Sequence, residues 1–289
     1  VPAGAGRSGL GTAGEGGATM TDTVQSALVE MGHEASTAPA RDTIETDILR
    51  GDILQLGRHR LLCGDCTNQD DVSRLLDGVG IDCLITDPPY CSGGFQEAGK
   101  SRGSIGSTVK HSIKSDTLST RGYQVLLKAT LSIIDLQALY IFTDWRMWVN
   151  LFDLVEASGY GVRSMIVWDK KSMGLGRGWR AQHELILHAR TSSASELFDN
   201  KIGCGNVVSI SRTGNKHHPT EKPVQLIEEI LRITKGAKTV YDPFAGSGTT
   251  LIACETRGRS CYAVEMVPEF CQIIVNRWER ASGQRAVIL

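Results

Sequence analysis

Residues 242–250 read Asp-Pro-Phe-Ala-Gly-Ser-Gly-Thr-Thr, and this stretch decides the fold. It follows the predicted strand Lys238–Tyr241 and precedes the predicted helix Thr249–Thr256. Two glycines in such a turn let a ligand approach the backbone closely at the edge of a parallel sheet. The next predicted strand leads into Glu265, a spacing suited to a carboxylate that binds the two hydroxyls of a ribose.

The turn lacks two features of phosphate-binding loops. Position 251 is Leu, where a dinucleotide fingerprint has its third glycine, and no lysine of the phosphate-binding type is present in the turn. The stretch therefore favours a nucleoside without phosphate over NAD or ATP.

Strands and helices alternate along the chain around this turn. The other predicted strands are Leu61–Cys63, Ile81–Thr86, Ala138–Thr143, Val162–Trp168, Glu184–His188 and Ser260–Val264, and the other predicted helices are Trp145–Ala157, Pro223–Ile233 and Pro268–Ala281. Alternation of this kind predicts an α/β fold whose parallel sheet is covered by helices on both faces.

A second motif, Asp87-Pro88-Pro89-Tyr90, directly follows a predicted buried strand. Two prolines stiffen the backbone and remove amide donors, so carbonyl oxygens remain free to accept hydrogen bonds. The Asp87 carboxylate and the Pro88 carbonyl could accept both hydrogens of a planar amino group, while Tyr90 stacks on the ring that carries it. A rigid strand end with a surface tyrosine is the simpler alternative.

Composition limits the class of protein. The chain has 289 residues, 41% hydrophobic and 22% charged, which is typical of globular proteins. It has no apolar stretch of membrane-spanning length and no secretory signal, and its eight cysteines show no zinc or disulfide framework. We expect a cytoplasmic protein with no metal. Residues 100–222 carry 17 Lys and Arg against 10 Asp and Glu, compatible with a polyanion bound at one face.

The sequence also predicts how the chain is divided. Residues 1–45 are polar and rich in small residues, the first methionine is Met20, and we interpret them as a disordered leader that is partly vector-derived. Residues 46–289 are expected to form a single domain. Within it, 91–122 is predicted as a mobile loop and 190–217 as a short segment without a strong pattern.

The two motifs together resemble the amino-group DNA methyltransferases that use S-adenosylmethionine. That family carries a (D/N/S)PP(Y/F/W) catalytic motif and an FxGxG cofactor motif, and the order found here resembles its permuted β group. Gly64-Asp65-Cys66, His218-Pro219-Thr220-Glu221-Lys222-Pro223, and Trp168 with Lys170, Arg180 and Glu184 resemble further elements of the family. The resemblance implies a Rossmann-like fold with a mostly parallel, seven-stranded sheet and circularly permuted motif order.

The resemblance also implies roles for individual residues. The catalytic residues would be Asp87, Pro88, Pro89 and Tyr90. The cofactor S-adenosylmethionine would be bound by Asp65, Cys66, Thr220, Lys222, Asp242, Phe244, Ala245, Gly246, Ser247, Gly248, Thr249 and Glu265. DNA would be contacted by Lys100, Arg102, Lys110, Lys114, Lys170, Arg177, Arg180, Arg212 and Lys216.

The expected reaction is methylation of adenine N6 in DNA, by direct displacement on a base that has left the duplex. Cytosine N4 is the closest alternative, and Asp rather than Ser at the first motif position favours adenine. Cytosine C5 chemistry is disfavoured because no Pro-Cys pair exists in the sequence. The short segment 190–217 occupies the place of the family's target-recognition segment, so a short or relaxed target sequence is expected. The protein would be a monomer or a homodimer.

Two other classes remain to be distinguished. Residues 94–101 match the phosphate-binding pattern GxxxxGK(S/T), but the glycine- and serine-rich residues that follow cannot make a good helix, which that motif requires. A P-loop NTPase would lose ATP on Lys100→Ala. A non-catalytic nucleic-acid-binding module would keep its DNA affinity in Asp87→Ala and never transfer a methyl group.

Overall fold

The computed structural model describes residues 44–89, 118–174, 177–199, 201–213 and 221–289. Its strands are β1 (Ile53–Leu56), β2 (His59–Cys63), β3 (Cys83–Thr86), β4 (Ala138–Thr143), β5 (Gly161–Asp169), β6 (His183–Arg190), β7 (Val207–Ser209), β8 (Thr239–Asp242), β9 (Ser260–Glu265) and β10 (Val287–Ile288). Its helices are α2 (Gln69–Leu76), α4 (Thr120–Ile133), α5 (Trp148–Ala157), α6 (Val224–Ile233), α7 (Thr249–Thr256) and α8 (Pro268–Ser282), together with the 3-10 helix η2 (Ser192–Leu197).

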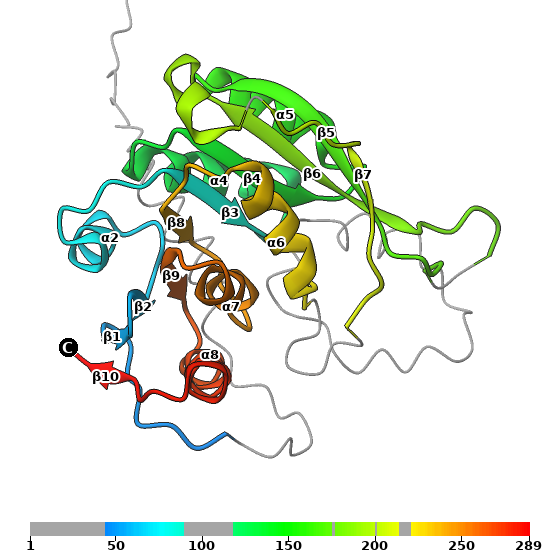
Figure 1. The fold of residues 1–289 in the computed structure, drawn as a ribbon. Coiled ribbons are helices and arrows are strands. Elements are labelled where there is room, and N and C mark those ends of the chain that lie inside the picture. The colour runs from blue at the N-terminus through cyan, green and yellow to red at the C-terminus, as the bar shows by residue number, and fades with distance from the viewer. Residues whose placement is uncertain (1–43, 90–117, 175–176, 200, 214–220) are drawn as a thin grey trace, which may run out of the picture.

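One sheet runs through the described ranges in the order β10-β1-β2-β9-β8-β3-β4-β6-β5-β7 (Figure 1). The seven predicted strands form its continuous centre, from β2 to β5, and all of them except β6 run in the same direction. The prediction of a mostly parallel, seven-stranded Rossmann-like sheet is therefore confirmed for the centre. Three short strands that the sequence did not indicate extend it: β1 and β10 at one edge and β7 at the other.

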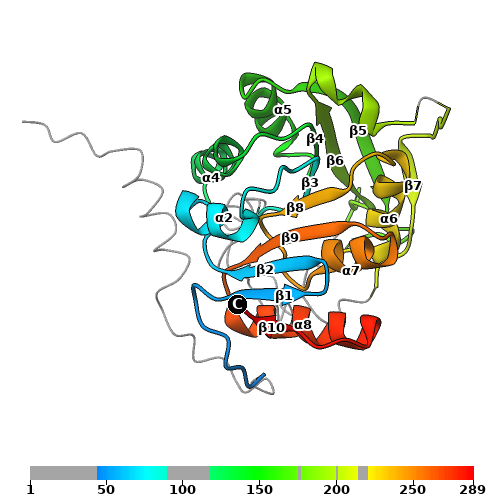
Figure 2. The same ribbon diagram turned by 60° about the vertical axis from the view of Figure 1, so that its left-hand side comes forward.

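Helices cover both faces of this sheet, as predicted (Figure 2). Adjacent strand residues point to opposite faces, so Val240 packs with Leu251 of α7 and Ile274 of α8. Its neighbour Tyr241 packs on the other face in the cluster that includes residues of α2, α4 and α5. Every residue of β3 and β4 is buried, which explains the continuous apolar composition of these two central strands.

Two helices were missed by the sequence analysis. Asn68 caps α2 by accepting hydrogen bonds from the backbone amides of Asp70 and Asp71, and Ser119 caps α4 in the same way through Gly122. Helix α4 begins at Thr120, so the predicted loop 91–122 is wrong at its carboxyl end. Its residues 91–117 lie outside the described part of the chain.

The other irregular segment also contains regular structure. Residues 190–213 include η2 and β7, and β7 pairs in parallel with β5. The prediction that residues 1–45 form a disordered leader concerns residues that lie almost entirely outside the described part of the chain. Among the helices that the structure describes, none has both the length and the apolar composition needed to cross a lipid bilayer.

The topology places the two motifs side by side. β8 pairs with β9 on one side and with β3 on the other, and all three strands are parallel. The chain leaves β8 through α7 towards β9 and leaves β3 through α4 towards β4. The point between β8 and β3 is therefore a topological switch point, where ligands bind at the carboxyl ends of parallel strands.

Candidate active site

Asp87 and Pro88 follow β3 at the carboxyl edge of the sheet. All four residues of β3 are buried, and the chain then enters the stiff Pro88-Pro89 pair. The Asp87 Oδ2 atom accepts a hydrogen bond from Lys222 Nζ at 2.6 Å, whereas its Oδ1 atom is buried and has no hydrogen-bond partner among the described residues. One oxygen of this carboxylate is thus fixed by the protein and the other remains available. Tyr90, predicted to stack on the base, lies outside the described residues.

The burial of Asp87 disfavours the ionised form of its carboxyl group. Burial raises the pKa of Asp87 to about 6, while the neighbouring Lys222 ammonium opposes the shift and the carboxylates of Glu184 and Asp242 add to it. The residue is therefore ionised at neutral pH, but only because a cation lies against it.

Lys222 is the centre of a buried group of charges. Its Nζ atom contacts Glu184 Oε2 at 3.1 Å as well as Asp87, and Glu184 Oε1 accepts a hydrogen bond from Lys170 Nζ. Burial alone would lower the pKa of Lys222, but Asp87 and Glu184 hold it above its usual value. Burial opposes ionisation of Glu184, yet the two lysines lower its pKa to about 2.

The turn after β8 forms the second corner of the site. Asp242 is 3% exposed and accepts hydrogen bonds from Thr86 Oγ1 at 2.9 Å, from the Phe244 backbone amide at 3.2 Å and from the Thr250 side chain. Burial raises the pKa of Asp242 to about 6. Through these hydrogen bonds Asp242 links β3, β8 and α7. All three donors are neutral groups, whereas the partner of Asp87 is a cation.

Glu265 follows the neighbouring strand and reaches the same turn. Its Oε2 atom accepts from the Gly246 backbone amide at 2.8 Å and its Oε1 atom from the Val267 amide at 2.9 Å. Burial raises the pKa of Glu265 to about 7 despite these bonds. The predicted spacing between the glycine turn and the acid is thus a direct contact.

The structure adds a packing reason for the second glycine of the turn. Gly246 and Gly248 both have positive φ, 54° and 78°. A Cβ atom on Gly248 would lie 2.9 Å from the Ile274 side chain, so α8 packs closely over this position. The backbone conformation and the packing of α8 therefore both require glycine at position 248.

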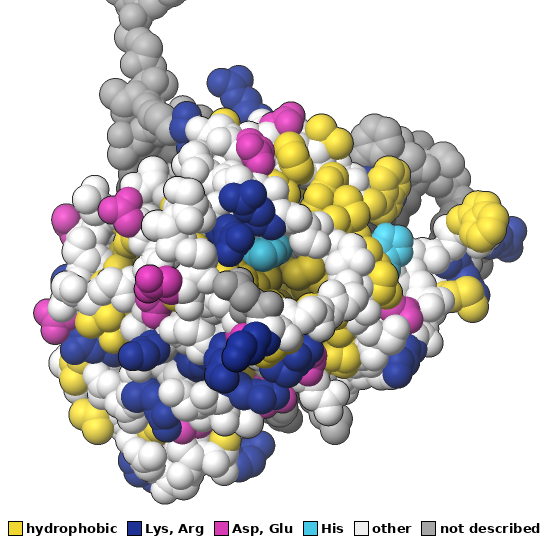
Figure 3. Space-filling model, turned by 45° about the horizontal axis from the view of Figure 1, so that its top comes forward, with side chains coloured by type: hydrophobic (Ala, Val, Ile, Leu, Met, Phe, Trp, Pro, Cys, Tyr) yellow, Lys and Arg dark blue, Asp and Glu magenta, His cyan; other side chains and the backbone are white. Residues whose placement is uncertain are grey.

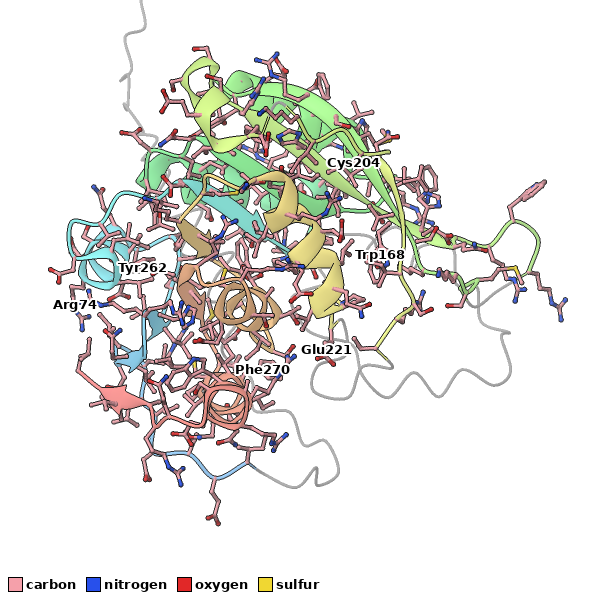
Figure 4. The ribbon with its side chains drawn as sticks, in the orientation of Figure 1. Arg74, Trp168, Cys204, Glu221, Tyr262 and Phe270 are labelled. Carbon is pink, nitrogen blue, oxygen red and sulfur yellow. The ribbon has the colours of Figure 1, made fainter. Side chains whose placement is uncertain are left out.

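Hydrogen bonds and an ion pair connect the segment that contains Lys222 to the turn after β8. Thr249 Oγ1 donates to the Lys222 carbonyl at 3.2 Å, and Arg277 of α8 donates to the Ser247 carbonyl and hydroxyl. Arg277 also pairs at 3.1 Å with Glu221, which lies just before α6 (Figure 4). Because of these contacts, the segment before α6 and the turn after β8 form one wall.

The two motifs line one cavity, as the sequence predicts from the distant stretches. Its volume is about 70 Å³, and its lining includes Asp87, Lys222, Asp242 and residues 244–247. Tyr90 and residues 214–220, including the predicted Lys216 and Thr220, adjoin it in sequence and lie outside the described part. A larger cavity of about 890 Å³ between α6 and β5–β7 contains none of the predicted site residues.

The Asp65-Cys66 pair is only partly where it was expected. Gly64 donates its backbone amide to the Glu265 carbonyl at 3.0 Å, which brings this segment to the cofactor corner. The Cys66 side chain, however, is 4% exposed and faces Thr130 of α4 at 3.8 Å, and burial raises the pKa of its thiol. The call on the Cys66 side chain as a cofactor contact is therefore corrected: it packs beneath the site.

Lys170 also differs from its prediction. It is 8% exposed and engaged with Glu184, so it does not offer its charge to a DNA phosphate. Arg177, Arg180 and Arg212 are exposed, as a DNA-binding role requires. Lys100, Arg102, Lys110 and Lys114 lie outside the described residues.

Arg177 and Arg180 belong to a lobe that includes the hairpin between β5 and β6, whereas Arg212 follows β7. Trp179 is fully exposed there, between Arg177 and Arg180. In Figure 3 hydrophobic and basic side chains stand together at the tip of the lobe that projects to the right.

Several residues outside the predicted site take part in it, among them Glu184 and Arg277, which carry charge, and Thr86 and Thr250, which donate to Asp242. Glu184 was noted only within the motif resemblance, and a glutamate that precedes the buried run 185–187 was the available signal. Arg277 had a signal as well, since it lies between the buried Val275 and Trp278 on α8. Across the described residues, no group of three or more His, Cys, Asp or Glu could hold a metal ion.

Comparisons with known proteins agree with this geometry. Residues 81–276 match the family model described as DNA methylase, which covers N6 and N4 methyltransferases. The Type II methyltransferase M2.LlaDCHI of Lactococcus lactis subsp. cremoris is 25% identical over 244 residues, covering 73% of this chain and 88% of that protein. The DNA adenine methyltransferase YhdJ of Escherichia coli (strain K12) is 25% identical over 242 residues, covering 71% and 79%.

A solved structure supports the same fold. The crystal structure of the M1.HpyAVI–SAM complex has a TM-score of 0.55 and 23% identity, and the match covers 75% of this chain and 98% of that one. Since the family model matches well over half of the sequence and spans both motifs, this chain belongs to the DNA methylase family.

Proposed function

We propose that this protein transfers a methyl group from S-adenosylmethionine to the N6 atom of adenine in DNA. The observation that carries the proposal is the available Oδ1 atom of Asp87, on the wall of the cavity that the glycine turn also lines. Beside it, the Pro88 carbonyl belongs to a segment without a competing amide donor.

The cofactor fits the residues of the second corner. A carboxylate has about four lone-pair positions. The backbone amides of Gly246, Val267 and Met266 use part of this capacity in Glu265, and the remainder is available to the ribose hydroxyls. The bound cofactor supplies an electrophilic methyl group on a sulfonium.

The protein's part in the reaction is to position the amino group. An exocyclic amino nitrogen is a poor nucleophile because its lone pair is delocalised into the ring. Asp87 Oδ1 and the Pro88 carbonyl accept its two hydrogens, which favours a pyramidal nitrogen with an available lone pair. As the nitrogen–carbon bond forms and the sulfur–carbon bond breaks, the nitrogen gains positive charge and then loses one proton on the Asp87 side.

DNA would approach along the carboxyl edge of the sheet. β5 runs parallel to β3, so the lobe with Trp179 follows a strand that ends at the same edge as Asp87. Exposed arginines suit phosphates, and an exposed aromatic ring suits the bases next to one that has left the stack. Binding should accordingly weaken with salt.

Adenine is favoured over cytosine N4 by Asp at the first position of the catalytic motif and by the relative YhdJ, which is named a DNA adenine methyltransferase. Cytosine N4 is the second candidate because the family model covers both reactions. The short segment 190–217 favours a short or relaxed target sequence.

Methylation of DNA with isotopically labelled cofactor, followed by mass analysis of the nucleosides, tests the proposal. Label in N6-methyl-2′-deoxyadenosine is expected. Label in N4-methylcytosine would replace the base assignment, and absence of label from every nucleoside would overturn the function.

A further inference from the structure

Four buried or half-buried charges of alternating sign connect the catalytic aspartate to the base of the exposed lobe. In order they are Lys170, Glu184, Lys222 and Asp87, with side chains 10%, 18%, 7% and 21% exposed. They come from four segments: the end of β5, the start of β6, the residue before α6's Pro223 cap, and the end of β3. The formal charges of these two lysines and two carboxylates sum to zero. Removal of any one of the four charges leaves the row with a net charge.

The row contacts only one side of the Asp87 carboxylate. Lys222 Nζ lies 2.6 Å from Oδ2 and 3.1 Å from Glu184 Oε2, and 5.4 Å from the centre of the Phe142 ring. Since an ammonium group has three donors in fixed directions, contacts with two carboxylates and a ring restrict where Lys222 can lie. The Asp87 side chain is restricted in turn, with Oδ1 left over.

We propose that Lys222, held by Glu184, is a positioning residue for methyl transfer: it fixes Oδ2 of Asp87 so that Oδ1 faces the amino group of the target base. The inference rests on the proposed function and adds the residues that orient its catalytic carboxylate. It differs from the expectation that Lys222 serves only the cofactor. Lys170 supports Glu184 from the far side.

The electrostatic consequences of the two neighbours have opposite signs. Three charged groups face Asp87: Lys222 of the segment before α6, Glu184 of β6 and Asp242 of β8. Lys170 and Arg212 lie further along the row, where Arg212 acts on Lys170 and Lys170 contacts Glu184. Lys222 lowers the pKa of Asp87, and Glu184 raises it. Removing either neighbour should therefore move the acidic limb of the pH–rate profile, in opposite directions.

The test compares Lys222→Met and Glu184→Gln in the full-length protein. With DNA and cofactor saturating, Lys222→Met should move the acidic limb of kcat to higher pH by about one unit or more, which is a loss of about fivefold or more at pH 6. Glu184→Gln should move that limb to lower pH while it reduces kcat on the plateau, because Lys222 is no longer held. Lys222→Arg should keep the limb near its wild-type position, since the charge remains.

Controls separate positioning from folding and from cofactor binding. Lys235→Met and Glu229→Gln remove charges from exposed ion pairs away from the site and should leave the profile unchanged. A positioning role predicts that cofactor dissociation constants stay close to wild type in Lys222→Met while kcat falls. If that variant does not fold, Glu184→Gln gives the decision through the opposite shift of the limb, and Lys222→Arg is its charge-preserving control.

The outcomes distinguish the inference from the function on which it rests. Wild-type protein that methylates no base in DNA would overturn the proposed function. Active wild-type protein whose acidic limb is unmoved in Lys222→Met and Glu184→Gln would overturn the inference alone. Lost cofactor affinity in Lys222→Met with kcat and its pH profile unchanged would also overturn it and assign Lys222 to the cofactor.

Discussion

Asp87 and Asp242 occupy equivalent places at the carboxyl ends of the neighbouring strands β3 and β8, but their surroundings differ. Both carboxylates line one cavity, and burial raises the pKa of each to about 6. Asp242 is satisfied by two threonine hydroxyls and a backbone amide. Asp87 has one ammonium partner and one oxygen with no partner among the described residues.

The difference indicates which carboxylate does chemistry. Buried polar groups in folded proteins are nearly always paired, so an oxygen without a partner in a cavity calls for a ligand. A carboxylate whose acceptors are all used joins structural elements instead. We therefore expect the same substitution, Asp to Asn, to have different consequences at the two positions.

Asp87→Asn should give the largest effect. The amide has one acceptor oxygen, so either the amino group of the base loses its acceptor or Lys222 loses its contact with position 87 and keeps only Glu184 as an ionic partner. Transfer should fall about 10²–10⁴-fold, the range for a positioned acid–base group. Single-turnover methylation measures this, and equilibrium cofactor binding serves as the control, which should change little. Transfer at the wild-type rate would remove Asp87 from the mechanism.

The pH dependence of transfer tests without mutation whether an ionised carboxylate with a raised pKa is essential. In the mechanism we propose, Asp87 Oδ1 accepts one amino hydrogen and later the proton that leaves the nitrogen, and only the ionised carboxylate can do both. Its pKa of about 6 in the folded protein means that the rate should be constant above pH 7 and fall about tenfold per unit well below pH 6. Single-turnover rates between pH 5 and pH 8 test this. A rate that stays flat down to pH 5 would contradict an essential carboxylate with a raised pKa.

Glu265, at the end of β9, is a third buried carboxylate that can be compared with the two aspartates. Like Asp242 it accepts hydrogen bonds from neutral donors, and like Asp87 it keeps acceptor capacity for a ligand. Burial raises its pKa to about 7. Because only the ionised form accepts from both ribose hydroxyls, cofactor affinity should rise as pH increases through 7, up to about tenfold between pH 6 and pH 8. Calorimetric titration at three pH values measures it. Glu265→Gln should weaken binding and abolish this dependence, and affinity that decreased with pH would contradict the ribose role.

The sequence was sufficient for the parts of this site that are local. A strand, a turn with two glycines and an acid after the next strand are read within one stretch of about 25 residues, and the contact between Gly246 and Glu265 follows from it. The seven central strands were predictable because strands buried on both faces have continuous apolar composition.

The charged row could not be predicted in the same way. It depends on the antiparallel register that sets Asp169 opposite His183 and so brings Lys170 to Glu184, and on the position of the segment before α6 relative to β3. Such register is specified by long-range packing rather than by local pattern. Helix α4 was missed because its apolar residues Leu126, Leu127 and Leu131 follow a glycine- and serine-rich stretch that hides where the helix begins.

Asp242→Asn should have the smallest effect. Its amide oxygen can still accept from Thr86 and Phe244, and its amide group can donate to the Thr250 hydroxyl, which is both donor and acceptor. The folded state raises the pKa of Asp242 above its unfolded value, so ionisation above pH 6 opposes folding and protonation between pH 6 and pH 4 favours it. The variant should consequently be as stable as the wild type or more so at pH 8, and should lose part of the gain in stability that acidification to pH 5 brings. Denaturant unfolding at the two pH values measures this, and single-turnover transfer should stay within several-fold of wild type. A large loss of cofactor binding would instead show that Asp242 contacts the cofactor. Both aspartates would then bind ligands, and Asp242 would not be a purely structural residue.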